Sequence, residues 1–343
     1  MNVRGIATGI GSLPFKDPEQ ALELIFNSVG QAPFWPQLPK RNAREGMVAQ
    51  FSENLPGFRV TDDGLEFDAE QAEEGLEKFY EHILSMDLGY FRISESYAAG
   101  LHAFAAALKN RSLSHVEFIK CHVTGPFTFA AGIKNSSGTA VVHDEVLMQA
   151  MSKGLLMKAL WQIDLFKRFG KPLIIFVDEP FLSGFGSAYT ALTRETAVRA
   201  LDEFCQPLKS QGALVGVHCC GNTDWSIFTE IKAIDIINFD AFGYLDKLCL
   251  YSRDLSAFFG RGGLLCWGIV PTQDFRDTIT LDQLREKVDS GIDAMVKKGI
   301  SRAQAEEQLL LSPSCGLGTL DAAASNKIFS LLSGLSANIR KAK

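Results

Sequence analysis

Three side chains near the ends of two apolar segments in this 343-residue chain are of types that bind zinc. His218 and Cys220 are two positions apart, so in an extended chain their side chains point the same way. Cys315 follows a later apolar run and precedes a glycine-bracketed turn. Imidazole and thiolate are good zinc donors, and Asp240, after the intervening run, offers an oxygen. We therefore expect Zn²⁺ bound by His218, Cys220, Cys315 and Asp240.

Such a donor set indicates the chemistry of the site. Zinc with two thiolates, one imidazole and a displaceable oxygen is open and electron-rich, which suits activation of a thiol. A thiol bound to the metal is deprotonated at neutral pH, whereas a free thiol with a pKa of about 8.5 is mostly protonated. One His or Cys near a strand end is more often structural, so the prediction rests on three together. Their predicted role is to prepare a substrate thiol for nucleophilic attack.

Other polar residues follow apolar runs at equivalent places. Asp178 and Glu179 offer two carboxylates, which could act as a general acid and base. We favour Asp178 as a substrate ligand and Glu179 as part of the scaffold. The turn Ile10, Gly11 and Ser12 offers backbone N–H groups and a hydroxyl, which suit a substrate carboxylate.

The remaining cysteines and histidines receive ordinary structural roles. Seven cysteines form an odd set without the dense spacing of a disulfide scaffold. Five are expected to be core thiols: Cys121, Cys205, Cys219, Cys249 and Cys266. Five histidines are expected on helices or on the surface: His82, His102, His115, His122 and His143.

The elements that must position these residues alternate between short apolar runs and longer helical patterns, which is typical of a parallel sheet. We count eight strand-like runs, the number that closes a barrel. The predicted fold class is α/β, a single (β/α)8 TIM barrel over residues 1–343. Helices are predicted at 145–169 and 193–210. The strand-like runs are 3–10, 90–95, 116–124, 172–178, 213–218, 234–240, 264–270 and 309–312.

A stretch of about 80 residues between the first two predicted strands is too long for a simple crossover. We expect residues 13–88 to form an insertion that packs over one mouth of the barrel. Its Trp35, Pro36 and Leu38 are costly to leave in water, so the insertion either only caps the barrel or also shapes a pocket.

Composition excludes some partners. The chain has 34 basic and 40 acidic residues, a net charge of -6, and no basic cluster for phosphates. Nucleic acid is therefore not an expected partner. No apolar run reaches the roughly 18 residues of a membrane span, and no secretory signal is recognisable. We expect a cytoplasmic protein with a small-molecule substrate and no membrane partner.

Several of these residues resemble motifs of one enzyme family. Ile10-Gly11-Ser12, the run 123–126 (VTGP) and Asp178-Glu179-Pro180 resemble motifs of the C-terminal catalytic domain of cobalamin-independent methionine synthase. That family lies in the superfamily that also contains uroporphyrinogen decarboxylase. More specific are His218-x-Cys220 and the run 313–317 (PSCGL), which resemble its zinc-ligand motifs. The resemblance covers most of the chain.

The resemblance implies a zinc-dependent methyltransferase of methionine biosynthesis, of the 5-methyltetrahydropteroyltriglutamate–homocysteine type. It also implies that Ile10 to Ser12 and Asp178 bind the carboxylate and amine of a homocysteine-like thiol, and that zinc binds the sulfur. In three places the chain departs from the family: Asp240 and Ala49 replace glutamates, and Ile269, two residues before Pro271, replaces a proton-donating histidine. A folate leaving group needs a proton and a corrinoid cobalt does not. A corrinoid protein is therefore an expected methyl donor.

Two alternatives remain. A uroporphyrinogen-decarboxylase-like enzyme would need a metal-free cavity lined by arginines and an aspartate, and arginines are sparse near the predicted strand ends. A non-catalytic zinc- or thiol-binding module is compatible with Ala49 and Ile269, because both stand where the resembled family has functional side chains.

Overall fold

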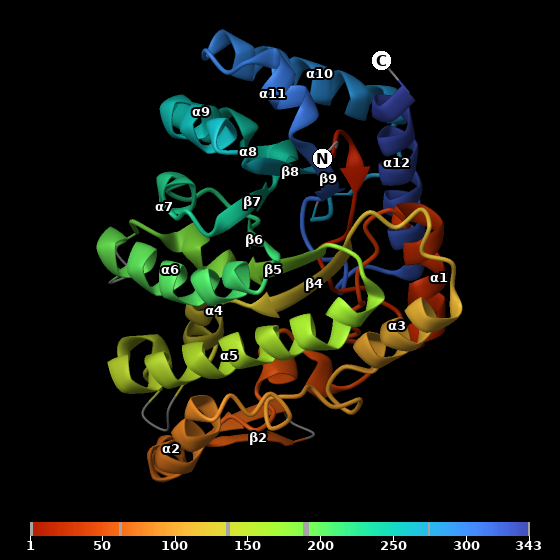
Figure 1. Cartoon of the computed structure of the whole chain (residues 1–343). Coiled ribbons are helices and arrows are strands. Elements are labelled where there is room, and N and C mark those ends of the chain that lie inside the picture. Colours follow the sequence, from red (N-terminus) through yellow and green to blue (C-terminus); the bar gives the residue numbers. More distant parts are fainter. Residues whose placement is uncertain (1–2, 62–63, 135–137, 188–191, 274, 342–343) are drawn as a thin grey trace.

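A computed structural model describes residues 3–61, 64–134, 138–187, 192–273 and 275–341. Its centre is a seven-stranded parallel sheet in the order β1-β9-β8-β7-β6-β5-β4, strongly curled in Figure 1. These strands confirm seven of the eight predicted runs, although the first is shorter than expected. They are β1 (Ile6–Ala7), β4 (Ile119–Thr124), β5 (Leu173–Asp178), β6 (Leu214–Cys219), β7 (Ile234–Phe239), β8 (Leu264–Val270) and β9 (Leu309–Pro313).

The strand predicted at 90–95 is wrong, because this segment is an irregular series of turns. Instead, residues 33–37 lie between the two edge strands of the sheet. The N–H of Gln37 donates to Gly11 O (3.0 Å), beyond β1, and the N–H of Lys120 on β4 donates to Pro33 O (2.9 Å). Pro33 and Pro36 have no N–H to donate, so the run forms isolated bridges rather than a full ladder.

This segment changes the boundaries predicted for the insertion, 13–88. Helix α1 (Pro18–Val29) is the connection between β1 and residues 33–37, and it packs against α3 (Ala99–Asn110) and α12 (Ala322–Lys341). The additional material therefore lies between residue 38 and α3. It holds 3-10 turns at Ala43–Glu45 and Ala49–Phe51, the hairpin β2 (Phe58–Thr61) and β3 (Gly64–Phe67), and α2 (Ala69–Leu84).

The remaining helices pack around the outside of the curled sheet (Figure 1). The predicted helix 145–169 is confirmed as α5 (Glu145–Phe166) with a 3-10 turn at Lys167–Phe169. The predicted helix 193–210 is confirmed as α6 (Arg194–Ser210), whose first turn is capped when Thr193 Oγ1 accepts from the N–H of Thr196 at 3.2 Å. The others are α4 (Pro126–Ala131), α7 (Ser226–Glu230), α8 (Ala241–Leu248), α9 (Ser252–Gly260), α10 (Leu281–Lys297) and α11 (Arg302–Glu307).

Alternation along the strands divides the core in two. On β5, Ile175 and Val177 belong to the large cluster beneath the helices, whereas Ile174 and Phe176 belong to a smaller cluster with residues of β1, β7, β8 and β9. The smaller cluster therefore fills the inside of the curl. At the C-terminal ends of β5 and β6 the inward positions become polar, with Asp178 and His218. Asp178 and His218 therefore lie at the C-terminal end of the sheet, next to the smaller apolar cluster.

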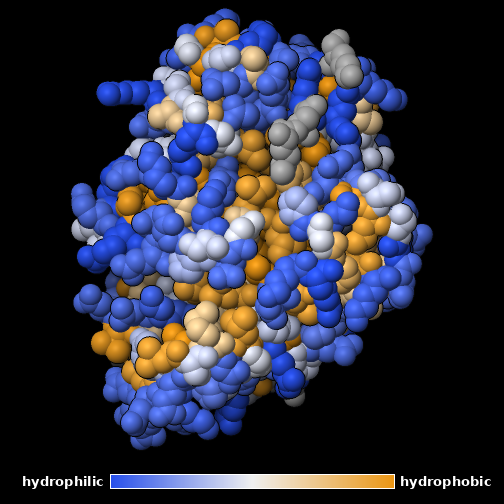
Figure 2. Space-filling view, in the orientation of Figure 1, coloured by the Kyte–Doolittle hydropathy of each residue, from blue (hydrophilic) through white to orange (hydrophobic). Residues whose placement is uncertain are grey.

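The surface in the view of Figure 1 is hydrophilic at the periphery, with hydrophobic residues gathered toward the middle (Figure 2). Among the described residues, no helix combines the length and apolar character needed to cross a membrane.

Candidate metal and substrate site

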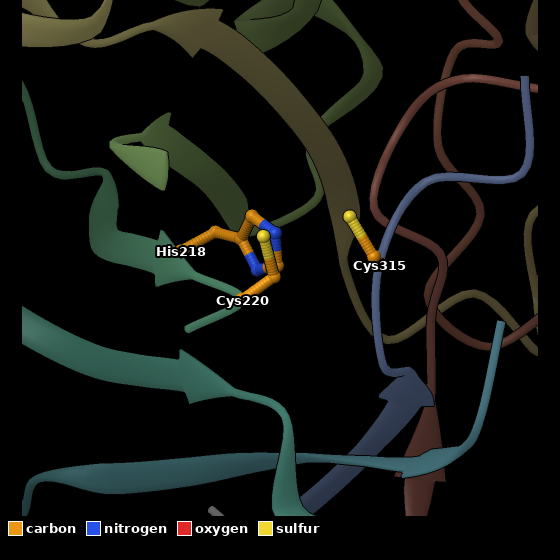
Figure 3. Close-up of side chains that lie close together, drawn as sticks. All are labelled: His218, Cys220 and Cys315. Atoms are coloured by element: carbon orange, nitrogen blue, oxygen red, sulfur yellow. The ribbon is translucent and has the colours of Figure 1, made fainter. Parts of the chain in front are cut away.

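The structure brings together His218, Cys220 and Cys315. Their donor atoms all lie within 4.8 Å of one another. His218 is on β6 and Cys220 directly follows it, while Cys315 comes from the loop after β9 and faces the other two (Figure 3). His218 is buried and both cysteines are half-buried. One imidazole and two thiols at this spacing suit a tetrahedral zinc ion, in which each residue supplies one donor atom.

Asn238, on the neighbouring strand β7, sets the orientation of the His218 ring. Its Oδ1 is 2.5 Å from Nδ1 of His218, and its Nδ2 donates to Cys266 O (2.8 Å) and Ser312 Oγ (2.8 Å). Because the amide uses both N–H groups elsewhere, Oδ1 is the acceptor and Nδ1 of His218 carries the proton. Nε2 then keeps its lone pair for a metal. Asn238 was missed in the sequence, although it is a polar residue inside an apolar strand.

Asp240 does not join this group of donor atoms. It is the N-cap of α8, where its Oδ1 accepts from the N–H of Gly243 at 2.9 Å. An aspartate before a helix commonly has this role, because its carboxylate binds an otherwise unpaired backbone N–H. Zinc ligation by Asp240 therefore stays a prediction.

The three donors open into a cavity of about 590 Å³. The predicted substrate residues Ile10, Gly11, Ser12 and Asp178 line the same cavity. Part of its wall comes from the region that was predicted to be an insertion. These lining residues are Gln37, Pro39, Lys40 and Met47. The region therefore shapes the pocket as well as covering the sheet.

The two adjacent carboxylates have different surroundings. Oδ1 of Asp178 is buried and bonds to none of the described residues, and burial raises the pKa of this carboxyl to about 6, against the opposing effect of Lys120. Glu179 accepts from the N–H groups of Phe127 (3.0 Å) and Thr128 (2.8 Å) at the start of α4. Glu179 thus has the scaffold role expected of it, whereas Asp178 is free to meet a ligand.

The turn at Ile10 to Ser12 is held open toward the cavity. The N–H groups of Gly11 and Ser12 make no hydrogen bond to another described residue. Ser12 Oγ accepts from the N–H of Gly318 at 3.3 Å, and a Cβ on Gly316 would lie only 2.2 Å from that oxygen. Glycine at 316 is therefore needed for this approach of the two loops.

The prediction that His122 lies on a helix or on the surface is wrong. It is on β4, only 2% exposed, and lines the cavity. The available signal was its place two residues before Thr124, on the same side of the strand. The other four histidines lie on helices or at the surface, as expected: His82 is on α2, His102 is on α3, and His115 and His143 are exposed. The five cysteines predicted to be core thiols are all buried.

Two positions that depart from the resembled family lie away from the ligand groups. Ala49 is buried in a 3-10 turn, and Ile269 belongs to the core beneath the helices, on the side of β8 opposite to the cavity. Neither side chain can supply a proton.

No protein-family model and no curated protein matches this sequence. Among solved structures, the chain is similar to a B12-independent methionine synthase from Shewanella sp. W3-18-1, solved in complex with selenomethionine. The two are 15% identical, the match covers 98% of each chain, and the TM-score is 0.62. A structure of fungal β-1,4-galactanases matches at 12% identity over 67% of this chain and 82% of its own, but its TM-score of 0.37 is too low to support an argument. The chain therefore shares the overall fold of the methionine synthase, which agrees with the resemblance predicted from its motifs.

Proposed function

We propose that this protein is a zinc-dependent methyltransferase that moves a methyl group onto the thiol of a homocysteine-like substrate. The observation that carries the proposal is the cluster of His218, Cys220 and Cys315 in one cavity with the unpartnered carboxylate of Asp178. In this proposal residues 1–343 form a single (β/α)8 barrel domain, with 33–37 as its closing strand.

The donor set fits zinc because two sulfurs and one neutral imidazole nitrogen converge, and Asn238 holds that nitrogen in the required tautomer. Zinc bound there would lower the pKa of a substrate thiol and keep the resulting thiolate nucleophilic. As a proposed fourth ligand, Asp240 would have to give up its hydrogen bond to Gly243.

The cavity also supplies groups for the rest of an amino acid. The N–H groups of Gly11 and Ser12 are proposed to bind the carboxylate, and Asp178 the amine. With a pKa of about 6, Asp178 is mostly ionised at neutral pH and can pair with an ammonium group. This pairing holds the sulfur end of the substrate toward His218, Cys220 and Cys315.

We propose a methylcorrinoid, presented by a corrinoid protein, as the methyl donor. The thiolate sulfur attacks the methyl carbon, the new S–C bond forms, and the Co–C electron pair remains on cobalt. That departure needs no proton, which agrees with the apolar Ile269 at the position where the family has its acid.

The alternatives predict different cavities or different turnover. The residues described around the cavity include no arginine, which disfavours a decarboxylase of the uroporphyrinogen type. A non-catalytic module would bind zinc and thiols without methyl transfer.

The test combines metal analysis, spectroscopy and turnover. We expect about one zinc per chain and an added sulfur in the zinc-edge X-ray absorption spectrum with L-homocysteine. We also expect methyl transfer from methylcobalamin, with methyltetrahydrofolate as the comparison donor. Full activity of metal-free protein would overturn the proposal, and tight zinc binding without transfer to any thiol would favour the non-catalytic module.

A further inference from the structure

His122 is a buried polar side chain whose ring nitrogens bond to none of the described residues. Both of its ring nitrogens are shielded from solvent and lack a hydrogen-bond partner. A buried polar group left in this state costs about 1–3 kcal/mol. The ring lines the cavity in which the candidate ligand groups lie.

One face of the ring packs against Trp35, and a hydrogen bond fixes the backbone of His122. The ring stacks on the indole of Trp35 with ring centres 3.8 Å apart and an interplanar angle of 21°. Gln162 of α5 joins the two residues, because its Oε1 accepts from the indole N–H of Trp35 (2.9 Å) and its Nε2 donates to the backbone O of His122 (3.0 Å). His122 is thus rigid before a ligand arrives, which lowers the entropic cost of binding.

The surroundings of the ring favour an anion. A Cβ on Gly11 would lie 2.8 Å from Cε1 and 3.0 Å from Nε2 of His122, so the ring adjoins the turn with unpartnered N–H groups. Beneath it, the buried ammonium of Lys120 donates to Ile10 O. The charge of Asp178 raises the pKa of Lys120 through space, although the described residues show no direct ion pair between the two.

Protonation sets what His122 can offer. Burial, and secondly the nearby Lys120, hold the pKa of His122 well below its usual value. The ring is therefore neutral at pH 7, with one N–H donor and one acceptor nitrogen. Burial lowers the pKa of Lys120 only to about 8, so the ammonium stays mostly charged at neutral pH.

We propose that His122 is a substrate-binding residue whose ring N–H donates to the carboxylate of the bound amino acid, beside the N–H groups of Gly11 and Ser12. The inference rests on the proposed function for the thiol of that ligand, but the contact itself requires no metal. It assigns carboxylate recognition to the platform formed by Trp35 and His122, on the strand next to the one that carries Asp178.

The experiment measures binding of three probes to zinc-loaded and to metal-free protein by calorimetry, or by ligand-observed NMR for weak affinities. L-Homocysteine has a thiol and a carboxylate, 3-aminopropane-1-thiol lacks the carboxylate, and L-2-aminobutyrate lacks the thiol. His122→Phe keeps a ring on Trp35 and removes both nitrogens, while His122→Asn restores an N–H donor. His102→Phe, on α3 outside the cavity, is the control.

We expect His122→Phe to weaken both carboxylate probes about tenfold or more and to leave 3-aminopropane-1-thiol within about twofold. His122→Asn should recover part of the loss, and His102→Phe should bind all three probes as wild type does. Equal losses for all probes, or none, would overturn the proposal, as would a wild-type protein that binds neither carboxylate probe. If L-2-aminobutyrate binding depends on His122 but the thiols gain nothing from zinc, the proposed function fails and the role of His122 stands.

Discussion

The two sides of the cavity differ in how their polar groups are satisfied. On the side of β6 and β9, Nδ1 of His218 is bonded to Asn238, which is itself bonded to Cys266 O and Ser312 Oγ. On the side of β4 and β5, both nitrogens of His122 and Oδ1 of Asp178 have no hydrogen-bond partner in the described part of the chain. On the first side, hydrogen bonds within the protein already fix the orientation of the His218 ring, as a metal ion of fixed geometry requires. On the second side, buried polar groups lack partners that a substrate could supply. These groups lower the stability of the free protein and favour binding of the substrate, so stability and function are opposed there.

The largest expected effect is on zinc content and comes from replacing Cys220 with serine, with the adjacent Cys219 as the matched control. Cys220 points to the cavity, whereas Cys219 is buried in the core beneath the helices. Cys220→Ser should lower the zinc content from about one per chain to below about 0.1 and abolish methyl transfer, because oxygen replaces a thiolate ligand. Metal analysis after dialysis measures it, with Cys219→Ser as the control that retains zinc. Zinc lost equally from both variants would show that instability is the cause.

The second effect tests whether Asn238 prepares the metal side. Asn238→Ala frees the His218 ring to rotate or change tautomer, and we expect zinc affinity to fall about 10–100-fold. Competition with a chromogenic chelator measures the affinity, and substrate binding to zinc-saturated protein serves as the control. An unchanged zinc affinity would mean that packing between the strands orients the His218 ring without the hydrogen bond to Asn238.

The third prediction concerns Asp178 on the unsatisfied side. Folding raises the pKa of this carboxyl from 3.8 to about 6, so the protonated form stabilises the fold. That contribution is complete below pH 3.8 and is lost as the pH rises through about 6. Asp178→Asn stays neutral, so we expect its free energy of unfolding to exceed wild type by about 1–2 kcal/mol at pH 7–8.

Urea unfolding of metal-free protein between pH 4 and pH 8 measures this difference, which should shrink toward pH 4. Binding of 3-aminopropane-1-thiol should weaken in the same variant, because its ammonium loses a charged partner. An Asp178→Asn protein that is less stable than wild type at pH 8 would contradict the opposition of stability and function.

The smallest expected effect comes from Ser312→Ala. This change removes one of the two acceptors of Asn238 Nδ2 and leaves Cys266 O in place. We expect zinc affinity to fall about two- to threefold, which corresponds to about 0.5 kcal/mol. The chelator competition assay applies here too. A loss as large as that of Asn238→Ala would show that Ser312, rather than Cys266 O, anchors the amide.

Sequence patterns located the metal side better than the substrate side. His218 and Cys220 share a side of their strand by spacing alone, and Cys315 follows another strand, so local rules were sufficient. The bridging segment 33–37 was missed because its prolines mask the strand pattern, and its bridges join residues far apart in the chain. His122 was readable from its spacing to Thr124. The bond between Asn238 and Ser312 depends on the curl of the sheet, which no local pattern encodes.

Residues 33–37 are paired with their neighbours by fewer hydrogen bonds than the strands of the sheet are with one another. This segment is joined to its neighbours through isolated bridges at Ser12 and Lys120, whereas β5 and β6 pair along five consecutive residues. Regions with fewer hydrogen bonds open at lower free energy and exchange their amide hydrogens sooner. We therefore expect the amides of Gln37 and Lys120 to exchange before those of β6, which a hydrogen-exchange time course would measure. The weakest pairing of the sheet therefore lies beside His122 and the turn at Gly11, whereas His218 is on a strand with continuous pairing.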